Sequence, residues 1–272
     1  MGAEGGKPYC CAETERNGPR SALSRPSPLP SMSAVTWYWI GLAFMAVGSV
    51  YFGFQASRAT ERRWQILWQL YFFICLIAAV LYLVMATGYG AVPAEAGRQT
   101  VWVRYVTWFT STPLLLLALT YLGRSSLPLT TALLGANAFM ILTGLVATLL
   151  DEGLLANVWW LISTGAYVAI ALSFLGRYKR EAKAALPSSG AVFDRIVLIH
   201  LVLWTAYPIV WMLSPEGLSV VSSDVEALLF MVLDVAAKVG FGFLAASSLR
   251  TIEQNGDAAA YEPTRLATSP AV

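Results

Sequence analysis

Apolar residues dominate seven stretches of the chain, and short segments rich in glycine, proline or charge separate these stretches. Each stretch has the roughly 20 residues that an α-helix needs to cross the apolar core of a bilayer. The expected spans cover about residues 35–56, 66–85, 100–122, 129–150, 158–175, 193–213 and 225–249. The pattern therefore predicts an all-α membrane protein, a bundle of seven transmembrane helices in a lipid bilayer.

The two ends of the chain differ from this apolar region. Residues 1–33 are rich in Pro, Gly, Ser and Arg, and residues 255–272 are polar, which is typical of disordered tails. We therefore expect one seven-helix domain over residues 34–254 with a disordered tail on either side. No internal repeat is apparent, so a transporter built from inverted halves is not favoured.

Charged residues in the connections predict the orientation of the helices. Basic residues gather in the first, third and fifth connections: Arg58, Arg62, Arg63, Arg124, Arg177, Lys179, Arg180 and Lys183. The alternate connections are mostly acidic and carry one basic residue: Glu95, Arg98, Asp151, Glu152, Glu216, Asp224 and Glu226. The positive-inside rule places the basic side in the cytoplasm. We therefore expect a multi-pass protein of the cell membrane, with its N-terminal tail extracellular and its C-terminal tail cytoplasmic.

Composition agrees with a chain that lies mainly in lipid. Hydrophobic residues make up 57% of the sequence and charged residues only 12%, whereas a soluble domain carries about 25% charged residues. The net charge of +2 and the lack of a basic patch argue against nucleic acid as a partner. Cys10, Cys11 and Cys75 do not suggest a disulfide framework, and the opening residues show no signal peptide. We expect neither an enzyme nor a metal site.

Four ionisable groups lie well inside the expected spans, away from their ends: Arg104, His200, Asp234 and Lys238. A charge at the bilayer centre costs about 2.5–3.5 kcal/mol or more, so it is a functional hypothesis by default. Asp234 and Lys238 are four residues apart and share one helical face. They form either a helix-stabilising ion pair or a site where a buried lysine reacts as a Schiff-base nucleophile. His200 has no acidic partner in sequence, which favours a packed histidine over a proton carrier.

Two further helical faces are polar or aromatic. Arg104, Thr107, Trp108 and Ser111 follow the i, i+3, i+4, i+7 spacing of a single face. Trp204, Tyr207, Pro208 and Trp211 form an aromatic stripe on the sixth span. Such a stripe is often only packing, but beside an embedded lysine it also fits the wall of a slot for a flat, apolar chromophore.

These residues carry a resemblance to the microbial rhodopsins. Residues 104–117 (RYVTWFTSTPLLLL) resemble helix C of that family, residues 203–211 (LWTAYPIVW) resemble helix F, and residues 233–242 (LDVAAKVGFG) resemble helix G. The likeness extends through Tyr82, Met140, Gly144 and residues 159–164, and covers about residues 34–254. It is closest to the cyanobacterial halorhodopsins in residues 64–67, 127–130 and 133–137.

The resemblance implies a bacteriorhodopsin-type bundle that binds all-trans retinal. Lys238 would hold retinal as a protonated Schiff base, and Asp234 would be its counterion. Trp108 and Trp211 would lie on either side of the polyene, Trp204 would press on its methyl group, and Tyr207 would hold Asp234. Met140, Gly144, Ser163 and Pro208 complete the retinal-binding residues that the resemblance implies. The trimers of the family also suggest a homotrimer.

Thr107 determines which ion we expect. The outward proton pumps of the family have an aspartate at this position, which accepts the Schiff-base proton. A threonine is neither charged nor a useful base near neutral pH. The protonated Schiff base and Arg104 each carry one positive charge, and Asp234 carries one negative charge. The remaining positive charge is costly in a low-dielectric bundle. Either the Schiff base deprotonates or a mobile anion enters, and we expect Thr107, Ser111 and Arg104 to bind chloride or another halide.

The sequence thus predicts a light-driven pump that moves halide inward. Thr107, Ser111 and Ala118 match the threonine, serine and alanine of haloarchaeal chloride pumps, although the cyanobacterial halorhodopsins carry aspartate where this chain has Ala118. Glu216 and Glu226 match the glutamates that release protons in the archaeal proton pump, and we interpret them as a polar extracellular gate. A photosensor and a light-gated anion channel remain alternatives, and an outward proton pump is disfavoured.

Overall fold

The computed structural model describes residues 33–93, 99–150 and 153–261. Several sequence-based expectations fall elsewhere. The N-terminal tail up to residue 32, Glu95, Arg98, Asp151, Glu152 and the end of the chain from residue 262 lie outside the described residues.

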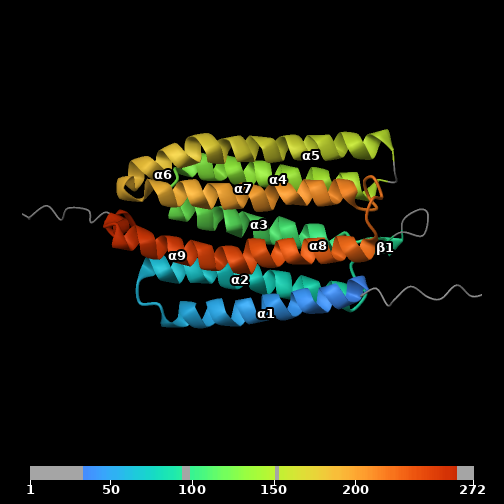
Figure 1. The fold of residues 1–272 in the computed structure, drawn as a ribbon, viewed down its shortest axis with the longest axis horizontal. Coiled ribbons are helices and arrows are strands. Elements are labelled where there is room, and N and C mark those ends of the chain that lie inside the picture. Colours follow the sequence, from blue (N-terminus) through green and yellow to red (C-terminus); the bar gives the residue numbers. More distant parts are fainter. Residues whose placement is uncertain (1–32, 94–98, 151–152, 262–272) are drawn as a thin grey trace, which may run out of the picture. The chain divides into compact units, whose positions relative to one another are not determined.

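Seven helices that are long and apolar enough to cross a membrane make up nearly all of the described chain (Figure 1). The first four are α1 (Ala34–Arg58), α2 (Arg62–Ala86), α3 (Val103–Leu122) and α4 (Leu127–Leu149). The fifth joins α5 (Leu154–Ser173), a π-helical turn (Phe174–Tyr178) and α6 (Lys179–Ala185). The sixth joins a 3-10 turn (Pro187–Ser189) and α7 (Gly190–Leu213), and the seventh joins α8 (Ser223–Val235), a π-helical turn (Ala236–Gly240) and α9 (Phe241–Gln254). The predicted all-α fold class is confirmed.

The only strands among the described residues lie between α2 and α3. Val92–Pro93 (β1) and Gln99–Thr100 (β2) pair antiparallel. Basic connections lie at one end of the bundle: the α1–α2 connection and α6 are both at the left of Figure 1, where α9 also ends. This shared end agrees with the charge pattern from which the orientation is predicted.

The fifth helix extends about ten residues beyond its predicted end, to Ala185. The basic residues that we expected in a loop, such as Arg177 and Lys179, therefore lie on helix. Lys, Arg, Glu and Ala are strong helix formers, and this charged turn continues past the apolar part of the span. Hydropathy measures only the apolar part, so it places the end too early.

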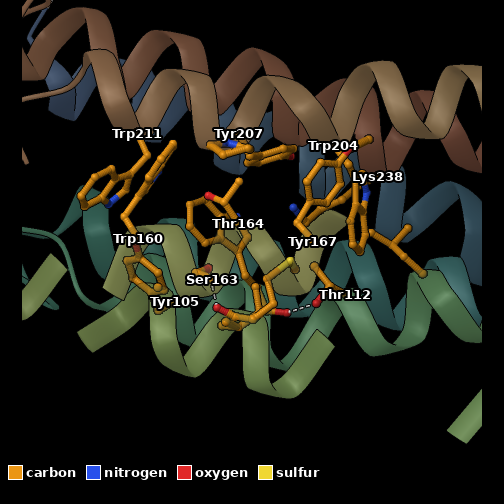
Figure 2. Close-up of a pocket in the computed structure, with 17 residues that line it drawn as sticks. Tyr105, Thr112, Trp160, Ser163, Thr164, Tyr167, Trp204, Tyr207, Trp211 and Lys238 are labelled. Atoms are coloured by element: carbon orange, nitrogen blue, oxygen red, sulfur yellow. Dashed lines mark hydrogen bonds between the residues drawn. The ribbon is translucent and has the colours of Figure 1, made fainter. Parts of the chain in front are cut away.

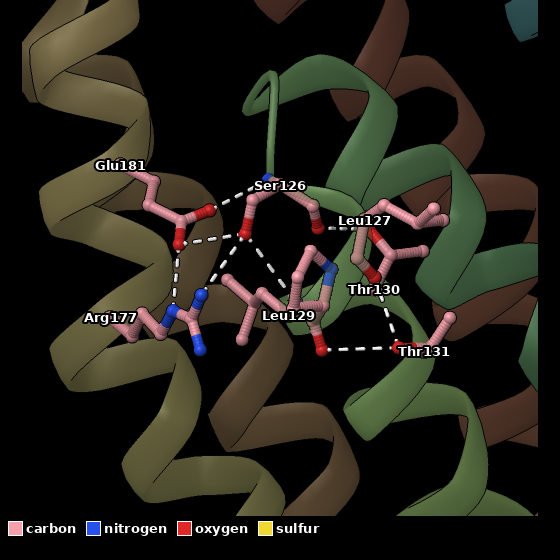
Figure 3. A network of polar contacts seen from close by, with 8 residues as sticks. Ser126, Leu127, Leu129, Thr130, Thr131, Arg177 and Glu181 are labelled. Atoms are coloured by element: carbon pink, nitrogen blue, oxygen red, sulfur yellow. Dashed lines mark hydrogen bonds and ion pairs between the residues drawn. The ribbon is translucent and has the colours of Figure 1, made fainter.

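The extended helix is tied to the start of α4 by a polar network (Figure 3). Glu181 accepts hydrogen bonds from the main-chain nitrogen of Ser126 (2.7 Å) and from its hydroxyl (3.0 Å). Arg177 pairs with Glu181 at 2.7 Å and donates to the Ser126 hydroxyl at 3.2 Å. Ser126 in turn caps α4 by accepting from the Leu129 nitrogen. The network fixes this end of α5–α6 against the α3–α4 connection.

Residues 255–261, which we expected in the disordered C-terminal tail, are ordered. Asp257–Tyr261 form a 3-10 helix, and Tyr261 is buried. The Tyr261 hydroxyl donates to the carbonyl of Leu122 at 2.5 Å, and Asp257 accepts from Ser189 at 2.7 Å. The tail composition is polar, but these side chains find partners on α3 and at the start of the sixth helix. This part of the boundary prediction is therefore corrected.

Helix α3 and the fifth helix approach closely at Gly123. A Cβ atom placed there would lie 2.6 Å from the ring of Tyr178. Tyr178 is fully buried, and its hydroxyl donates to the Leu119 carbonyl at 2.8 Å. The ring therefore has little freedom to move away from a side chain at position 123.

We expect Gly123→Ala to destabilise the bundle by about 1–3 kcal/mol, because an added methyl group overpacks this contact. The matched control is Gly135→Ala, where nothing lies within 4 Å of the added Cβ and the better helix propensity of alanine favours stability by up to about 1 kcal/mol. The midpoint of thermal loss of helical circular dichroism, in one detergent, measures both. Equal midpoints for Gly123→Ala and wild type would contradict the packing argument.

Candidate functional site

Five ionisable side chains of the described residues are buried in the interior of the bundle, one more than we expected. Arg104, Glu226, Asp234 and Lys238 are 6%, 5%, 2% and 1% exposed, and they form two ion pairs, Arg104–Glu226 and Asp234–Lys238. The fifth, His200, packs against Trp204 and Phe174, with ring centroids 4.4 and 4.7 Å away. These contacts agree with the predicted packed histidine.

The Asp234 carboxylate is held by groups from three helices. Lys238 pairs with Oδ1, Tyr207 of α7 donates to the same oxygen at 2.9 Å, and Tyr82 of α2 donates to Oδ2 at 3.0 Å. Three donors hold the carboxylate in one position and fix its direction. The contact from Tyr207 was expected, whereas that from Tyr82 was not. Gly41 makes room for it, since a Cβ there would lie 2.5 Å from the Tyr82 ring.

Lys238 lies in the π-helical turn that separates α8 from α9. Such turns often occur at functional sites because they change the direction of the side chains they carry. The side chain is fully buried and lines an internal cavity (Figure 2). Eight other residues implied by the resemblance also line this cavity: Trp108, Met140, Gly144, Ser163, Trp204, Tyr207, Pro208 and Trp211.

The cavity has the properties that a retinal site requires. Figure 2 shows Lys238 and Trp204 towards one end, and Trp160 and Trp211 at the other. Between them the lining is mainly aromatic and aliphatic, as an apolar polyene requires. At Gly144 a Cβ would lie only 3.1 Å from the Ser163 hydroxyl and 3.3 Å from the Tyr105 ring, so the glycine keeps this wall thin. An elongated apolar aldehyde that reacts with the Lys238 amine therefore fits.

Trp211 differs from its expected place. The resemblance implies Trp108 and Trp211 on either side of the polyene. Instead, Trp211 stacks on Trp160 (6.3 Å between centroids, 22° between planes) and donates to Thr148 at 2.7 Å, at the end of the cavity away from Lys238. Trp211 therefore closes the far end of the cavity. Helical spacing places Trp211 on the inner face of α7. Its contact with Trp160 depends on how α5 packs in the bundle, which spacing along one helix does not give.

Eight lining residues were not among those singled out from the sequence: Tyr105, Thr112, Leu115, Ile141, Trp160, Thr164, Tyr167 and Ala237. Some carried a usable signal. Thr112 and Leu115 continue the face of Trp108 at i+4 and i+7, and Ala237 adjoins Lys238. Tyr105 lies beside Arg104 on α3. The others come from α4 and α5, where apolar residues surround the helix and periodicity does not indicate which face is inside.

The predicted anion-binding residues lie on α3 and are buried, but they do not line the cavity. The Thr107 hydroxyl donates to the Val103 carbonyl at 3.2 Å, and the Ser111 hydroxyl donates to the Thr107 carbonyl at 2.6 Å. Arg104, which we expected to help hold an anion, pairs with Glu226. These groups have partners within the protein that an anion would have to replace.

The charge count made from the sequence needs correction, because it left out Glu226. Lys238 and Asp234 balance each other, and Arg104 and Glu226 do the same, so the four buried charges sum to zero when all are ionised. Glu226 looked like a connection residue, but α8 begins at Ser223 and the side chain is buried. A signal was present, since Glu226, Phe230, Asp234 and Lys238 follow one another at four-residue spacing on one face.

Comparison with known proteins places the chain among rhodopsins. The model of the family described as bacteriorhodopsin-like protein matches residues 32–252. The bacteriorhodopsin of Haloterrigena sp. is 34% identical over 90% of this chain and 96% of its own length. Archaerhodopsin-1 of Halorubrum ezzemoulense is 36% identical over 86% of this chain and 90% of its own.

Solved structures give the same picture. The cyanorhodopsin of the cyanobacterium Calothrix sp. superposes with a TM-score of 0.77 at 37% identity, covering 84% of this chain and 98% of that one. The thermophilic rhodopsin of Rubrobacter xylanophilus has a TM-score of 0.76 at 37% identity, over 82% and 99% of the two chains. The bacteriorhodopsin type of the fold is thereby confirmed, while the expected special likeness to halorhodopsins stays a prediction.

We expect Lys238→Ala, mixed with all-trans retinal, to lack a visible absorption band, because no other amine of the described residues lines the cavity. The matched control is Lys179→Ala, which removes an amine that pairs with Asp194 outside the cavity and should keep the band. Absorption spectra of both purified variants, with circular dichroism to check folding, provide the measurement. A retinal band that persists in folded Lys238→Ala without added amine would refute the assignment.

Proposed function

The chain belongs to the bacteriorhodopsin-like family of microbial rhodopsins, light-driven ion pumps and photosensors with a retinal chromophore, and we propose that it is a light-driven pump that moves chloride or another halide inward. The single observation that carries this proposal is the hydroxyl residue at Thr107. It lies one helical turn beyond Arg104 on the buried face of α3. Asp234 is the only carboxylate among the described residues that contacts Lys238.

Thr107 removes the chemistry that an outward proton pump needs. A proton leaving Lys238 on light absorption requires a base on the outward path, and a threonine hydroxyl does not accept a proton near neutral pH. Asp234 is already held by Tyr82 and Tyr207 as well as by Lys238. A mobile ion other than the proton is therefore favoured.

The α3 hydroxyls supply donors that suit an anion. Thr107 and Ser111 are both buried and lie one turn apart. Each now donates to a main-chain carbonyl of its own helix, and a hydroxyl can rotate away from that bond. Two such donors, with the charged end of Lys238, would replace part of the hydration shell that a halide loses. Arg104, one turn away, would add a positive charge.

Retinal bound to Lys238 would supply light absorption and an isomerisation that reorients the charged nitrogen. The chain's own residues do the rest. Asp234 fixes the direction of the Lys238 nitrogen, and the aromatic walls around Trp108 and Trp204 confine the polyene. Thr107 and Ser111 would hold the anion on the extracellular side until the nitrogen turns. Ala118 places no carboxylate on the cytoplasmic part of α3, so nothing there repels the anion.

The orientation, the direction of transport and the oligomer are part of the same proposal. The basic end of the bundle would face the cytoplasm, which puts the N-terminus outside and the C-terminus inside. A homotrimer in the cell membrane is expected. The second candidate is a photosensor, and the observation that favours it is the balance of the four buried charges, which leaves Asp234 sufficient as counterion without a halide.

Illuminated cells that contain the protein should turn the external medium alkaline, and a protonophore should enhance this change. Inward anion movement makes the cell interior negative and draws protons in passively, and a protonophore opens a path for them. A pH electrode in a weakly buffered cell suspension is the measurement, with cells containing Lys238→Ala as the control. Acidification that the protonophore abolishes would indicate an outward proton pump instead.

Removing halide from the purified protein should shift the visible band to the red, and adding halide should reverse the shift. A nearby negative charge stabilises the ground state, in which the positive charge lies on the Lys238 nitrogen, more than the excited state. Thr107→Asp should blunt the response, because a fixed carboxylate replaces the mobile anion. Ser111→Ala should weaken halide affinity by about 1–3 kcal/mol, since a buried donor is lost.

The matched control is Thr110→Ala, which removes an exposed hydroxyl from the same helix and should leave halide affinity unchanged. The measurement is a spectroscopic titration with chloride, bromide and sulfate. A wild-type spectrum that ignores all three from micromolar to molar concentration would leave Asp234 as the sole counterion and favour the photosensor.

A further inference from the structure

The buried Arg104–Glu226 pair bears on how an anion enters the site. Arg104 contacts Glu226 through one guanidinium nitrogen. The central carbon of the Arg104 guanidinium lies 4.3 Å from the centre of the Phe230 ring. Tyr38 of α1 interacts electrostatically with Arg104. Apart from Lys238, Arg104 is the positive charge near Thr107 that could attract an anion. Arg104 already pairs with a carboxylate of the protein itself, that of Glu226.

We propose that Glu226 is an internal competitor of the halide, and that each halide bound at Thr107 and Ser111 is accompanied by one proton taken up by the Glu226 carboxylate. This inference rests on the proposed anion-binding function and adds its regulation. Protonation turns the Glu226 carboxylate into a neutral carboxylic acid, and the proton comes from the extracellular solution. Arg104 then keeps its positive charge without a charged partner, and the halide takes over that role.

Charge balance is the reason for the coupling. Lys238, Asp234, Arg104 and Glu226 sum to zero when all four are ionised. A halide added to this set would leave one uncompensated negative charge in a low-dielectric interior, which is costly. Neutralising Glu226 restores the balance. Asp234 is the less suitable group for this proton, because it accepts from Tyr82, Tyr207 and Lys238, whereas Glu226 has one charged partner.

The groups around Glu226 are compatible with this role. Arg104 of α3, Tyr38 of α1 and Glu216 of the α7–α8 connection interact electrostatically with Glu226, and Tyr82 and Tyr105 interact electrostatically with Arg104. Glu216 accepts from the Ser214 hydroxyl at 2.8 Å and adds a second negative charge on the same side of the bundle. Glu226 lies in the first turn of α8, next to exposed Ser222 and Ser223, so solvent protons have a short path.

The coupling has a definite sign. Because the Glu226 carboxylate must gain a proton when halide binds, halide affinity should fall as pH rises. While Glu226 is ionised in the halide-free protein, the dissociation constant should increase by up to about tenfold per pH unit. A site without this coupling would show no such slope in the pH range where the visible band is intact.

Proton uptake in the dark provides a direct test on the wild-type protein. Chloride or bromide is added to unbuffered, retinal-loaded protein, and a pH electrode records the medium while the visible band records binding. We expect the medium to turn alkaline in proportion to the bound halide, approaching one proton per halide. Addition of gluconate, a large organic anion, is the blank. A halide-induced band shift without proton uptake would overturn the coupling and leave the proposed anion function standing.

Two variants identify the group that takes up the proton. Glu226→Gln should bind halide more tightly than wild type at neutral pH, with an affinity that no longer depends on pH, and should take up no proton. The matched control is Glu216→Gln, which removes the neighbouring carboxylate and should keep the pH dependence. An unchanged slope in Glu226→Gln, or a slope lost in Glu216→Gln, would overturn the assignment. If Glu226→Gln does not hold the chromophore, the wild-type proton uptake decides alone. The absence of any halide response at every pH would instead refute the anion function itself.

Discussion

The ion pair between Lys238 and Asp234 is the interaction on which the rest of the site depends. Two charges taken out of water cost several kcal/mol each, and they are tolerated only where further hydrogen bonds complete them. Tyr82 and Tyr207 provide these bonds from two other helices. Their hydroxyls must reach one carboxylate, so α2, α7 and α8 are held at a fixed rotation and height. The close approach at Gly41 is part of this requirement.

A second pair, Arg104–Glu226, lies on the same face of α8 two turns before Asp234. The two pairs make the interior electrically balanced in the absence of any ion. In the proposed halide pump, an anion would enter this balanced interior only together with a change in another charge, so halide binding and protonation of Glu226 would be coupled. In that proposal Thr107 sets the choice of ion, because a threonine hydroxyl cannot act as the base that a proton would need.

Helix count and the positions of the embedded charges followed from hydropathy and spacing, whereas helix ends did not. The fifth helix continues through Arg177 and Glu181 because charged helix formers extend it beyond the apolar span, and hydropathy does not register them. Tyr261 looked like part of a polar tail, yet its ring is buried and its hydroxyl bonds to Leu122. This hydrogen bond joins segments more than a hundred residues apart, so local composition cannot predict it.

By itself, the sequence determined seven apolar spans, the shared face of Asp234 and Lys238, and the hydroxyl at Thr107. These are properties of single helices, fixed by a 3.6-residue period and by residue chemistry. The tertiary structure alone decided which side chains meet across helices: Tyr82 with Asp234, Glu226 with Arg104 and Trp160 with Trp211. These pairings depend on how far each helix is rotated and shifted against its neighbours. That is set by close packing over the whole bundle, so no single segment contains it.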